Sequence, residues 1–203
     1  MQHRSTAVAA TVALTIAAAA NASLIRPTSA TATSEFSGSY VIANAINGSG
    51  LPADFGPGDS HATYTTNNHW TTRANQTIGQ SATFLFDTPQ DLAIFYMWAH
   101  RSNNIATNPH YAVTRFDLVF RDSASNELAT LTDLVGVPNV LTAQQYDFPV
   151  VSGVSSVQFI VRATANNNSS PYTGLAEVAF GIPAPGTLAA AAGLLAFAGR
   201  RRR

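Results

Sequence analysis

Histidines are the first residues of this sequence that could do chemistry, because a neutral imidazole is a common metal ligand and proton carrier. His61, His69, His100 and His110 all fall in the middle of the chain. Their spacing matches no helical pair of ligands and no named zinc signature, and the chain has no cysteine that could add a thiolate. We therefore expect no transition-metal site.

Hydrolytic chemistry has two candidate signals, and both are weak. Gly58-Asp59-Ser60 imitates the nucleophile block of GDSL-type hydrolases, but the later Asp-x-x-His that these enzymes need does not occur. A pair of carboxylates could hydrolyse a glycoside, although the distance between two carboxylates cannot be read from a sequence. We expect no enzyme, and an extracellular hydrolase stays the last of three functional hypotheses.

Charged residues make up only 11% of the 203 residues, against about 25% in a typical soluble domain. All eleven basic residues are arginines, and Arg4 and residues 200–203 lie at the two ends. Without those five, six arginines face eleven acidic residues, which is a net charge of −5. A mildly acidic body without lysine predicts no nucleic-acid partner. The absence of cysteine excludes a disulfide scaffold.

The N-terminus has the three parts of a secretory signal peptide. A short basic region ends at Arg4, an apolar run extends from Ala7 to Ala20, and Ala20-Asn21-Ala22 provides the small residues of a cleavage site. We interpret residues 1–22 as a signal peptide, which predicts an exported protein.

The C-terminal residues 182–203 combine a proline-rich motif, a short apolar stretch and an arginine cluster. Pro183, Ala184 and Pro185 precede an apolar stretch from Gly186 to Gly199, and Arg200, Arg201, Arg202 and Arg203 end the chain. As a helix, the stretch would span only ~21 Å, less than the ~30 Å of a membrane core. This favours a transient membrane-held signal over a lasting tail anchor, which stays the alternative.

This tail resembles the PEP-CTERM sorting signal of bacterial envelope and biofilm proteins. The resemblance implies processing by an exosortase-type enzyme and at least transient anchoring in the inner membrane. Ala184 stands where that family usually has Glu, which removes the acidic member of the motif. The expected location is the cell envelope or the extracellular matrix.

The middle of the chain reads as an all-β domain, because short alternating or apolar runs are separated by turn residues and no amphipathic helix of ten residues occurs. We expect residues 23–34 to be a flexible lead and residues 35–181 to form a jelly-roll β-sandwich. Asp87-Thr88-Pro89 is expected to end the first strand. The expected strands are 81–86, 92–99, 113–121, 128–134, 144–150, 157–163 and 174–180.

The same region resembles discoidin-like, galactose-binding-type jelly rolls. The resemblance rests on four fragments in the family's order: Ala43-Asn44-Ala45-Ile46-Asn47-Gly48, His69-Trp70-Thr71-Thr72, Thr83-Phe84-Leu85-Phe86-Asp87 and Gly174-Leu175-Ala176-Glu177-Val178. It implies that Trp70 is a packing residue rather than a platform for a sugar.

The resemblance also implies a structural calcium site between the opening loop and the last strand. The implied ligands are the backbone carbonyls of Asn44, Ser49 and Ala176, the side chains of Asn47 and Glu177, and a hydroxyl from the stretch that ends at Thr63. Asn47 stands where the family prefers Asp, which removes one negative charge. The alternative is that Glu177 caps a hydrogen-bond network and Asn47-Gly48 is a tight turn.

The resemblance further implies glycan binding by loops at one end of the sandwich. The candidate contacts are His100, Arg101, Asn103 and Asn104, because these side chains hydrogen bond to sugar hydroxyls, and Tyr64 and Tyr111 could offer ring faces. An ordinary solvated loop is the alternative. The first hypothesis is therefore an exported, non-enzymatic protein that binds a polysaccharide or surface glycan. The second is a structural matrix protein without a specific sugar site.

Overall fold

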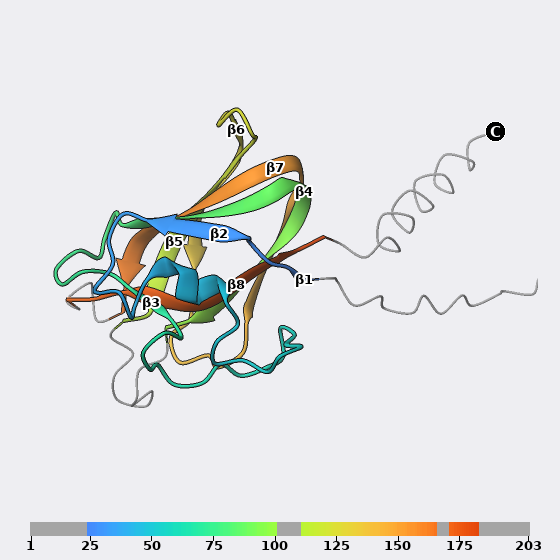
Figure 1. Ribbon diagram of the computed structural model, residues 1–203. Helices are drawn as coiled ribbons and strands as arrows, with labels where there is room; N and C mark the ends of the chain where they lie inside the picture. The colour runs from blue at the N-terminus through green and yellow to red at the C-terminus, as the bar shows by residue number, and fades with distance from the viewer. Residues whose placement is uncertain (1–23, 101–110, 166–170, 183–203) are drawn as a thin grey trace, which may run out of the picture. The chain divides into compact units, whose positions relative to one another are not determined.

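The computed structural model describes residues 24–100, 111–165 and 171–182, which form an antiparallel β-sandwich with one short 3-10 helix (Figure 1). The predicted all-β class is confirmed. The elements are β1 (Leu24–Ile25), β2 (Ser29–Ala32), η1 (Ile42–Ile46), β3 (Trp70–Thr71), β4 (Ser81–Ala99), β5 (Val113–Arg121), β6 (Glu127–Val135), β7 (Gln144–Thr164) and β8 (Gly174–Gly181).

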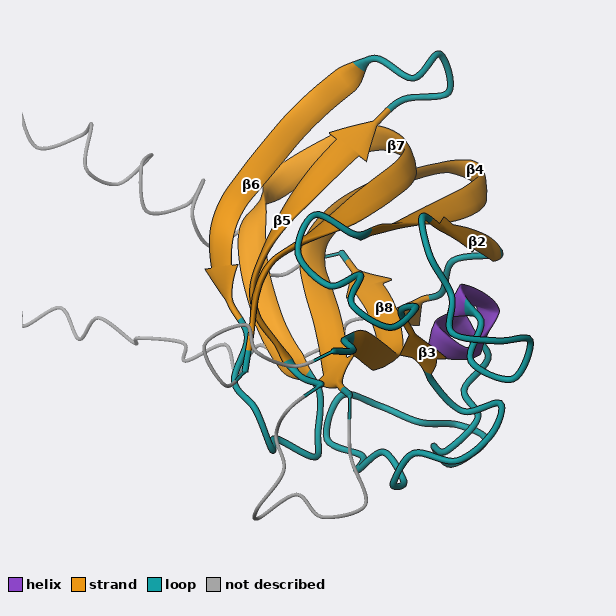
Figure 2. Ribbon diagram, turned by 90° about the vertical axis from the view of Figure 1, so that its left-hand side faces the viewer, coloured by secondary structure: helices purple, strands orange, loops and turns teal. Residues whose placement is uncertain are grey.

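Two layers arise because β4 and β7 are long enough to take part in both. The strand order is β1-β8-β4-β7-β5-β6, with β2 on β4 and β3 on β8. The first part of β4 pairs with residues 156–160 of β7, and its second part pairs with residues 144–151 of β7 and with β8. Figure 2 shows the curved strands and, beside β3, the helix η1 next to several long loops.

The expected break at Asp87-Thr88-Pro89 is wrong, because β4 runs through it from Ser81 to Ala99. The register with β7 shifts between Leu85 and Gln90, so the ladder is irregular where the three residues lie. Proline is tolerated at such irregular positions because it need not donate a ladder hydrogen bond. The expected strands 144–150 and 157–163 are likewise one bent strand, β7.

The described part of the expected flexible lead is ordered into the sheet. Leu24 and Ile25 pair with the end of β8, and Ser29 to Ala32 pair with residues 82–85 of β4. β1 has only two residues, too few to show alternation, and β2 consists of Ser, Ala and Thr, which form no alternating apolar pattern in the sequence. The sandwich therefore begins before residue 35.

The core lies between the two layers and follows the predicted alternation. Phe116, Leu118 and Phe120 of β5 are fully buried, as are Val157 and Phe159 of β7. The rings of Phe116 and Phe159 stack with centroids 4.7 Å apart. On the opposite face, the Asp117 carboxylate accepts a hydrogen bond from Arg162 Nε at 2.7 Å. Such diagonal cross-strand pairs support the register of a sheet.

Trp70 is a packing residue, as the sequence resemblance implies. Its side chain is 0% exposed, and its indole N–H donates to the Ser34 carbonyl at 2.9 Å. Gly174 lies opposite Thr71, and a Cβ at this glycine would come within 1.9 Å of the Trp70 carbonyl oxygen. The absence of a side chain at Gly174 thus lets β8 pair closely with β3, the strand that contains Trp70 and Thr71.

We expect Trp70→Phe to lower the free energy of unfolding by about 2 kcal/mol. The substitution leaves a space in the core and removes the indole N–H that donates to the carbonyl of the buried Ser34. Urea denaturation followed by far-UV circular dichroism measures the change. An unaltered denaturation midpoint would contradict the role of Trp70 as a core anchor.

Candidate functional site

Three of the four histidines considered from the sequence are buried close together. His61 follows the loop after η1, His69 precedes β3, and His100 follows β4, with exposed fractions of 1%, 1% and 5%. The rings of His69 and His100 meet edge to face with centroids 4.5 Å apart. His110 lies outside the described residues. Tertiary structure alone brings these imidazoles together.

Hydrogen bonding fixes how His69 holds its proton. Asn68 Oδ1 accepts the Thr65 backbone N–H at 2.7 Å, so this oxygen also accepts from His69 Nδ1 at 2.8 Å. His69 therefore carries its proton on Nδ1. Burial, reinforced by the nearby His61, lowers the pKa of His69 to about 4. Burial also lowers the pKa of His100 well below its ordinary value, helped by His69 and His61. Both rings are neutral at neutral pH.

Within the parts of the chain that the structure describes, no group of three or more His, Cys, Asp or Glu side chains is arranged to hold a metal ion. The imidazoles instead pack against tyrosines. Tyr64 meets His69 at 4.9 Å and His100 at 5.5 Å between ring centroids. His69 and His100 thus belong to a larger group of aromatic rings.

A pocket of about 160 Å³ opens beside this group of rings. We call it the aromatic pocket, and its lining residues are Phe36, Tyr40, Tyr64, Thr71, His100, Tyr111 and Tyr172. Tyr64 and Tyr111 were expected to offer ring faces to a ligand, and both line it. His100 also lines it, although it is buried at the end of β4 rather than exposed in a loop.

Backbone hydrogen bonds hold the lining residues in place. The Phe36 N–H donates to the Thr71 carbonyl at 2.8 Å, and the Thr71 N–H donates to the Tyr40 carbonyl at 3.1 Å. On the other side, the Thr173 hydroxyl donates to the Tyr111 carbonyl at 3.0 Å. These bonds connect the pocket to Thr71 of β3 and to the residues that precede β5 and β8.

The rings around the pocket form a closed circuit, which we call the aromatic circuit. Its successive centroid distances are 5.6 Å for Phe36–Tyr40, 5.1 Å for Tyr40–His69, 4.5 Å for His69–His100, 5.3 Å for His100–Tyr111, 5.5 Å for Tyr111–Tyr172 and 5.4 Å for Tyr172–Phe36. Each pair lies within the 4.5–7 Å range of favourable aromatic contacts. The circuit presents ring edges and faces to a ligand.

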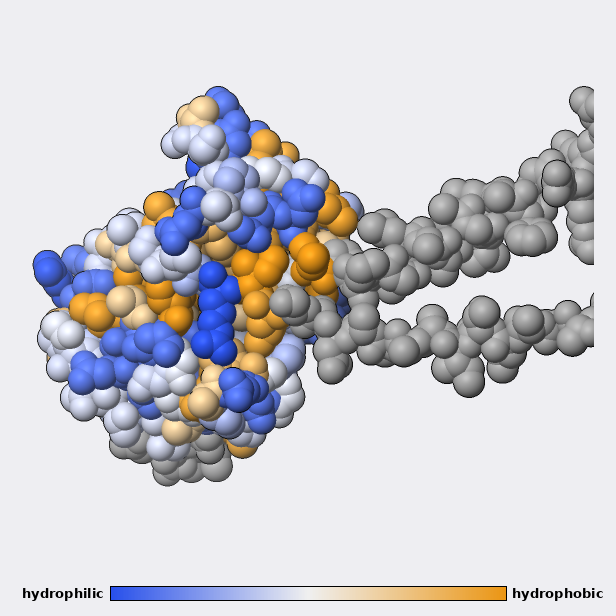
Figure 3. Space-filling view, turned by 45° about the vertical axis from the view of Figure 1, so that its right-hand side comes forward, coloured by the Kyte–Doolittle hydropathy of each residue, from blue (hydrophilic) through white to orange (hydrophobic). Residues whose placement is uncertain are grey.

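A second hollow, of about 370 Å³, lies between β6 and the turn of β7. It is lined by Leu128, Ala129, Leu131 and residues 149–152. These side chains offer neither an aromatic face nor a charge. Figure 3 shows that apolar and polar residues are mixed on one face of the sandwich. The aromatic pocket is therefore the stronger candidate for a ligand.

Two hydrogen bonds connect the segments that contain the candidate calcium ligands. The Gly48 N–H donates to Glu177 Oε2 at 3.0 Å, and the Ala62 N–H donates to the Gly50 carbonyl at 2.8 Å. These bonds join the loop with Asn47 and Ser49, the stretch leading to Thr63, and β8. Gly48 has a φ of +71°, a left-handed conformation that glycine adopts readily.

Glu177 is fully buried, and its Oε1 has no hydrogen-bond partner in the described structure. Burial raises the pKa of Glu177 to about 8, although the Gly48 N–H and the Arg26 guanidinium act in the opposite direction. The preceding Ala176 lies at a register shift, between Glu177, which pairs with Trp98, and Leu175, which pairs with Ala99. A residue at such a shift is free of regular ladder pairing.

The alternative interpretation of this loop also has support. Asn47 Oδ1 accepts the Ser49 N–H at 2.7 Å, which is a local turn. Asn44 is buried, and its amide donates to the Ser39 and His69 carbonyls at 3.0 Å. Asn44 therefore links the candidate calcium loop to His69 of the aromatic circuit.

Several sequence-based candidates lie outside the described residues. They are the glycan candidates Arg101, Asn103 and Asn104, the signal peptide, and the sorting-signal residues Pro183, Ala184, Pro185, Arg200, Arg201, Arg202 and Arg203. The described residues include no helix with the length and apolar character to cross a bilayer.

Sequence reasoning missed Phe36, Tyr40, Thr71 and Tyr172 as pocket residues. Phe36 is 47% exposed, which is unusual for a large aromatic side chain. Phe36, Tyr40 and Tyr172 stand in segments rich in Ser, Gly and Pro, and isolated aromatic residues in such segments are the signal that could have indicated them.

No family model matches the chain, and no curated protein matches it. Similarity appears among solved structures. The family 32 carbohydrate-binding module of Clostridium perfringens NanJ, solved with galactose, has a TM-score of 0.53 at 13% identity, covering 75% of this chain and 91% of that one. A Streptococcus pneumoniae fucose binding module has a TM-score of 0.55 at 15% identity, with coverages of 79% and 95%.

An F5/8 type C domain from Bacteroides fragilis has a TM-score of 0.53 at 15% identity, with coverages of 79% and 95%. At these identities the similarity establishes the fold. The predicted discoidin-like, galactose-binding-type jelly roll is confirmed.

Proposed function

We propose that this protein is a non-catalytic glycan-binding module, and that the aromatic pocket is its binding site. The observation that carries the proposal is the pocket itself: five Phe and Tyr side chains line it together with Thr71 and His100, whose Oγ1 and Nε2 atoms lie 3.3 Å apart. Aromatic faces stack on pyranose rings, while hydroxyl and imidazole groups hydrogen bond to sugar hydroxyls. The similarity in fold to modules solved with galactose or described as fucose-binding supports this ligand class.

Export and sorting form the second part of the proposal and rest on the sequence. Residues 1–22 would direct secretion, and residues 182–203 would be handled by an exosortase-type enzyme at the inner membrane. The protein would then present its pocket to polysaccharide in the cell envelope or extracellular matrix.

A structural calcium ion is the third part. The buried Glu177 Oε1 without a hydrogen-bond partner and the position of Ala176 at the register shift both fit an oxygen-ligated cation. Asn47, Ser49, the carbonyl of Asn44 and Thr63 would complete the shell. A bound calcium ion would supply the positive charge that a buried carboxylate needs. Its role would be to connect the loop after η1 to β8.

A glycan and polysaccharide array tests the function. The purified protein is expected to bind a defined set of sugars, and Phe36→Ala is expected to weaken this binding about fivefold, since one stacking face contributes on the order of 1 kcal/mol. Val135→Ala is the matched control, because Val135 is 56% exposed on β6 and does not line the pocket.

If Phe36→Ala and Val135→Ala both lose glycan binding, or if neither does, the binding site lies outside the aromatic pocket. If a demonstrably folded sample binds no glycan, the binding proposal is wrong, and the structural matrix role becomes the better account.

A further inference from the structure

The aromatic pocket has a composition that favours a particular ligand. Its described lining consists of five aromatic side chains of the Phe and Tyr type, one imidazole and one hydroxyl, without any charged side chain. The aromatic circuit closes around it, so a group in the pocket lies against several rings at once. Cations are attracted to ring faces within about 6 Å of a centroid, and aromatic cages bind ammonium groups in this way.

Among the described residues of the pocket lining and the aromatic circuit, the side chains that could carry a positive charge are neutral. His69 and His100 do not carry charge at neutral pH, because burial lowers the pKa of both. The Thr71 hydroxyl and the hydroxyls of Tyr40, Tyr64 and Tyr111 can accept hydrogen bonds from an N–H donor. The described residues that line the pocket thus offer hydrogen-bond acceptors and carry no fixed positive charge.

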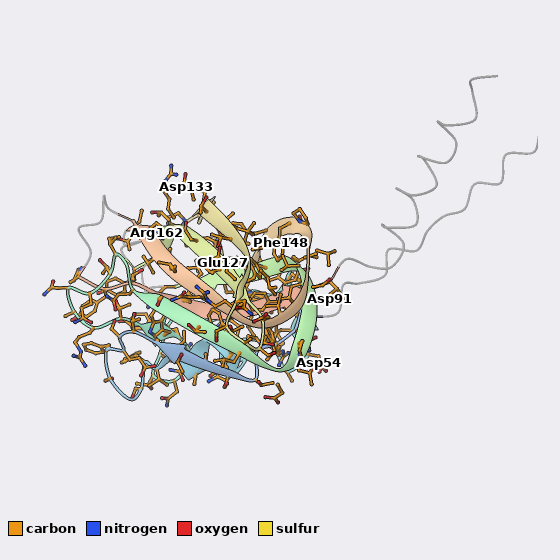
Figure 4. The ribbon with its side chains drawn as sticks, turned by 90° about the horizontal axis from the view of Figure 1, so that it is seen from above. Asp54, Asp91, Glu127, Asp133, Phe148 and Arg162 are labelled. Atoms are coloured by element: carbon orange, nitrogen blue, oxygen red, sulfur yellow. The ribbon has the colours of Figure 1, made fainter. Side chains whose placement is uncertain are left out.

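The charge of the surrounding domain acts in the same direction. Between residues 24 and 182 there are six arginines and eleven acidic residues, which is a net charge of −5. The labelled carboxylates Asp54, Asp91, Glu127 and Asp133 come from separate parts of the sandwich (Figure 4). A spread of negative charge attracts cationic ligands toward the domain.

The size of the pocket limits what enters it. Its volume of about 160 Å³ is below the ~300–1,000 Å³ of ordinary small-molecule sites. It therefore has room for one sugar unit or one substituent rather than for an oligosaccharide. The remainder of a chain-like ligand would stay outside.

We propose that the aromatic pocket selects an ammonium group, so that the glycan it recognises carries protonated amino groups in place of neutral or N-acetylated ones. This inference rests on the proposed function and gives it a substrate class: amino sugars with free amines. Ring faces of the aromatic circuit and the hydroxyl acceptors hold the ammonium group. Contacts to the sugar ring then distinguish one polysaccharide from another.

Isothermal titration calorimetry with a matched pair of oligosaccharides tests the inference. Glucosamine oligomers at pH 6 carry an ammonium on each unit, whereas N-acetylglucosamine oligomers of equal length are neutral. The glucosamine oligomers are expected to bind about tenfold more tightly, which corresponds to about 1.4 kcal/mol. Tetramethylammonium is expected to compete for the site.

Two substitutions at Tyr111 separate the pocket from general attraction to an acidic domain. Tyr111→Phe keeps the ring face and is expected to keep the preference, while Tyr111→Leu removes one of several ring faces at unchanged net charge and is expected to reduce the preference several-fold. Equal or tighter binding of the N-acetylated oligomers would overturn the inference and leave glycan binding intact. A preference that is undiminished in Tyr111→Leu would also overturn it. Binding of neither oligomer, with a silent glycan array, would instead overturn the proposed function.

Discussion

In the calcium-free protein, ionisation of Glu177 is expected to lower the free energy of unfolding by about 3 kcal/mol as the pH rises from 5 to 8. The Glu177→Gln variant is expected not to show this loss. The carboxyl group is fully buried, and burial raises its pKa from 4.5 to about 8. Between these two values the folded protein holds a proton that the unfolded chain releases. Stability is therefore present at low pH and is lost as the pH rises.

Calcium is expected to reverse this loss. The ion would stabilise the ionised carboxylate of Glu177, so that saturating calcium raises the stability of the wild-type protein at pH 8 but not that of Glu177→Gln. The glutamine keeps an oxygen that can accept the Gly48 N–H, which limits other effects of the change.

Urea denaturation at pH 5, 6, 7 and 8, in calcium and in chelator, measures both effects. The difference between variant and wild type isolates Glu177 from all other titrating groups. Parallel pH profiles of the two proteins would show that Glu177 does not titrate as its burial predicts. An equal response of the two proteins to calcium would contradict the metal site.

Acidification is expected to destabilise the sandwich through the buried histidines, by about 3 kcal/mol from His69 alone between pH 7 and pH 4. Burial lowers the pKa of His69 from 6.5 to about 4, and that of His100 also falls. Below pH 6.5 the His69 imidazole binds a proton in the unfolded chain, whereas in the folded protein it stays neutral until the pH approaches 4. Stability therefore falls as the pH drops from 6.5 toward 4, in the opposite direction to the effect of Glu177.

His69→Phe is the variant that separates this effect from the protonation of surface carboxylates. Phenylalanine fills a similar space without a titrating group, and it loses the hydrogen bond to Asn68 at every pH. The variant is therefore expected to be less stable at pH 7 but to have a flatter profile between pH 7 and pH 4. A slope as steep as that of the wild-type protein, in the same urea experiment, would contradict the assignment.

The alternation of apolar and polar residues in the sequence predicted which side chains of a strand face the core. The alternation of Phe116, Leu118 and Phe120 places these residues on one face of a strand, and all three are buried in the core. Such alternation has a period of two residues and is set by the geometry of each strand alone. For the same reason it does not show where a strand bends from one layer to the other. β4 and β7 were therefore expected as two strands each.

The candidate calcium residues could be named from the sequence only through its resemblance to discoidin-like jelly rolls, which implies such a site between the opening loop and the last strand. The burial of Glu177 and its bond to the Gly48 N–H, from the far end of the chain, needed the tertiary structure. The proposed export and sorting signals at the two ends rest on sequence pattern alone.

The aromatic pocket was decided almost wholly by tertiary structure. Tyr64, His100 and Tyr111 could be selected as candidates because their side chains suit sugar recognition. Nothing local relates them to Phe36, Tyr40 or Tyr172. These residues meet because β3 and β8 pair at Gly174 and because η1 and its flanking loops pack at that end of the sandwich. The sequence by itself thus determined the β-strands and the chemical character of the candidates, because both depend on single residues and their immediate neighbours. Only the fold determined which rings surround one pocket, because that depends on contacts between strands far apart in the chain.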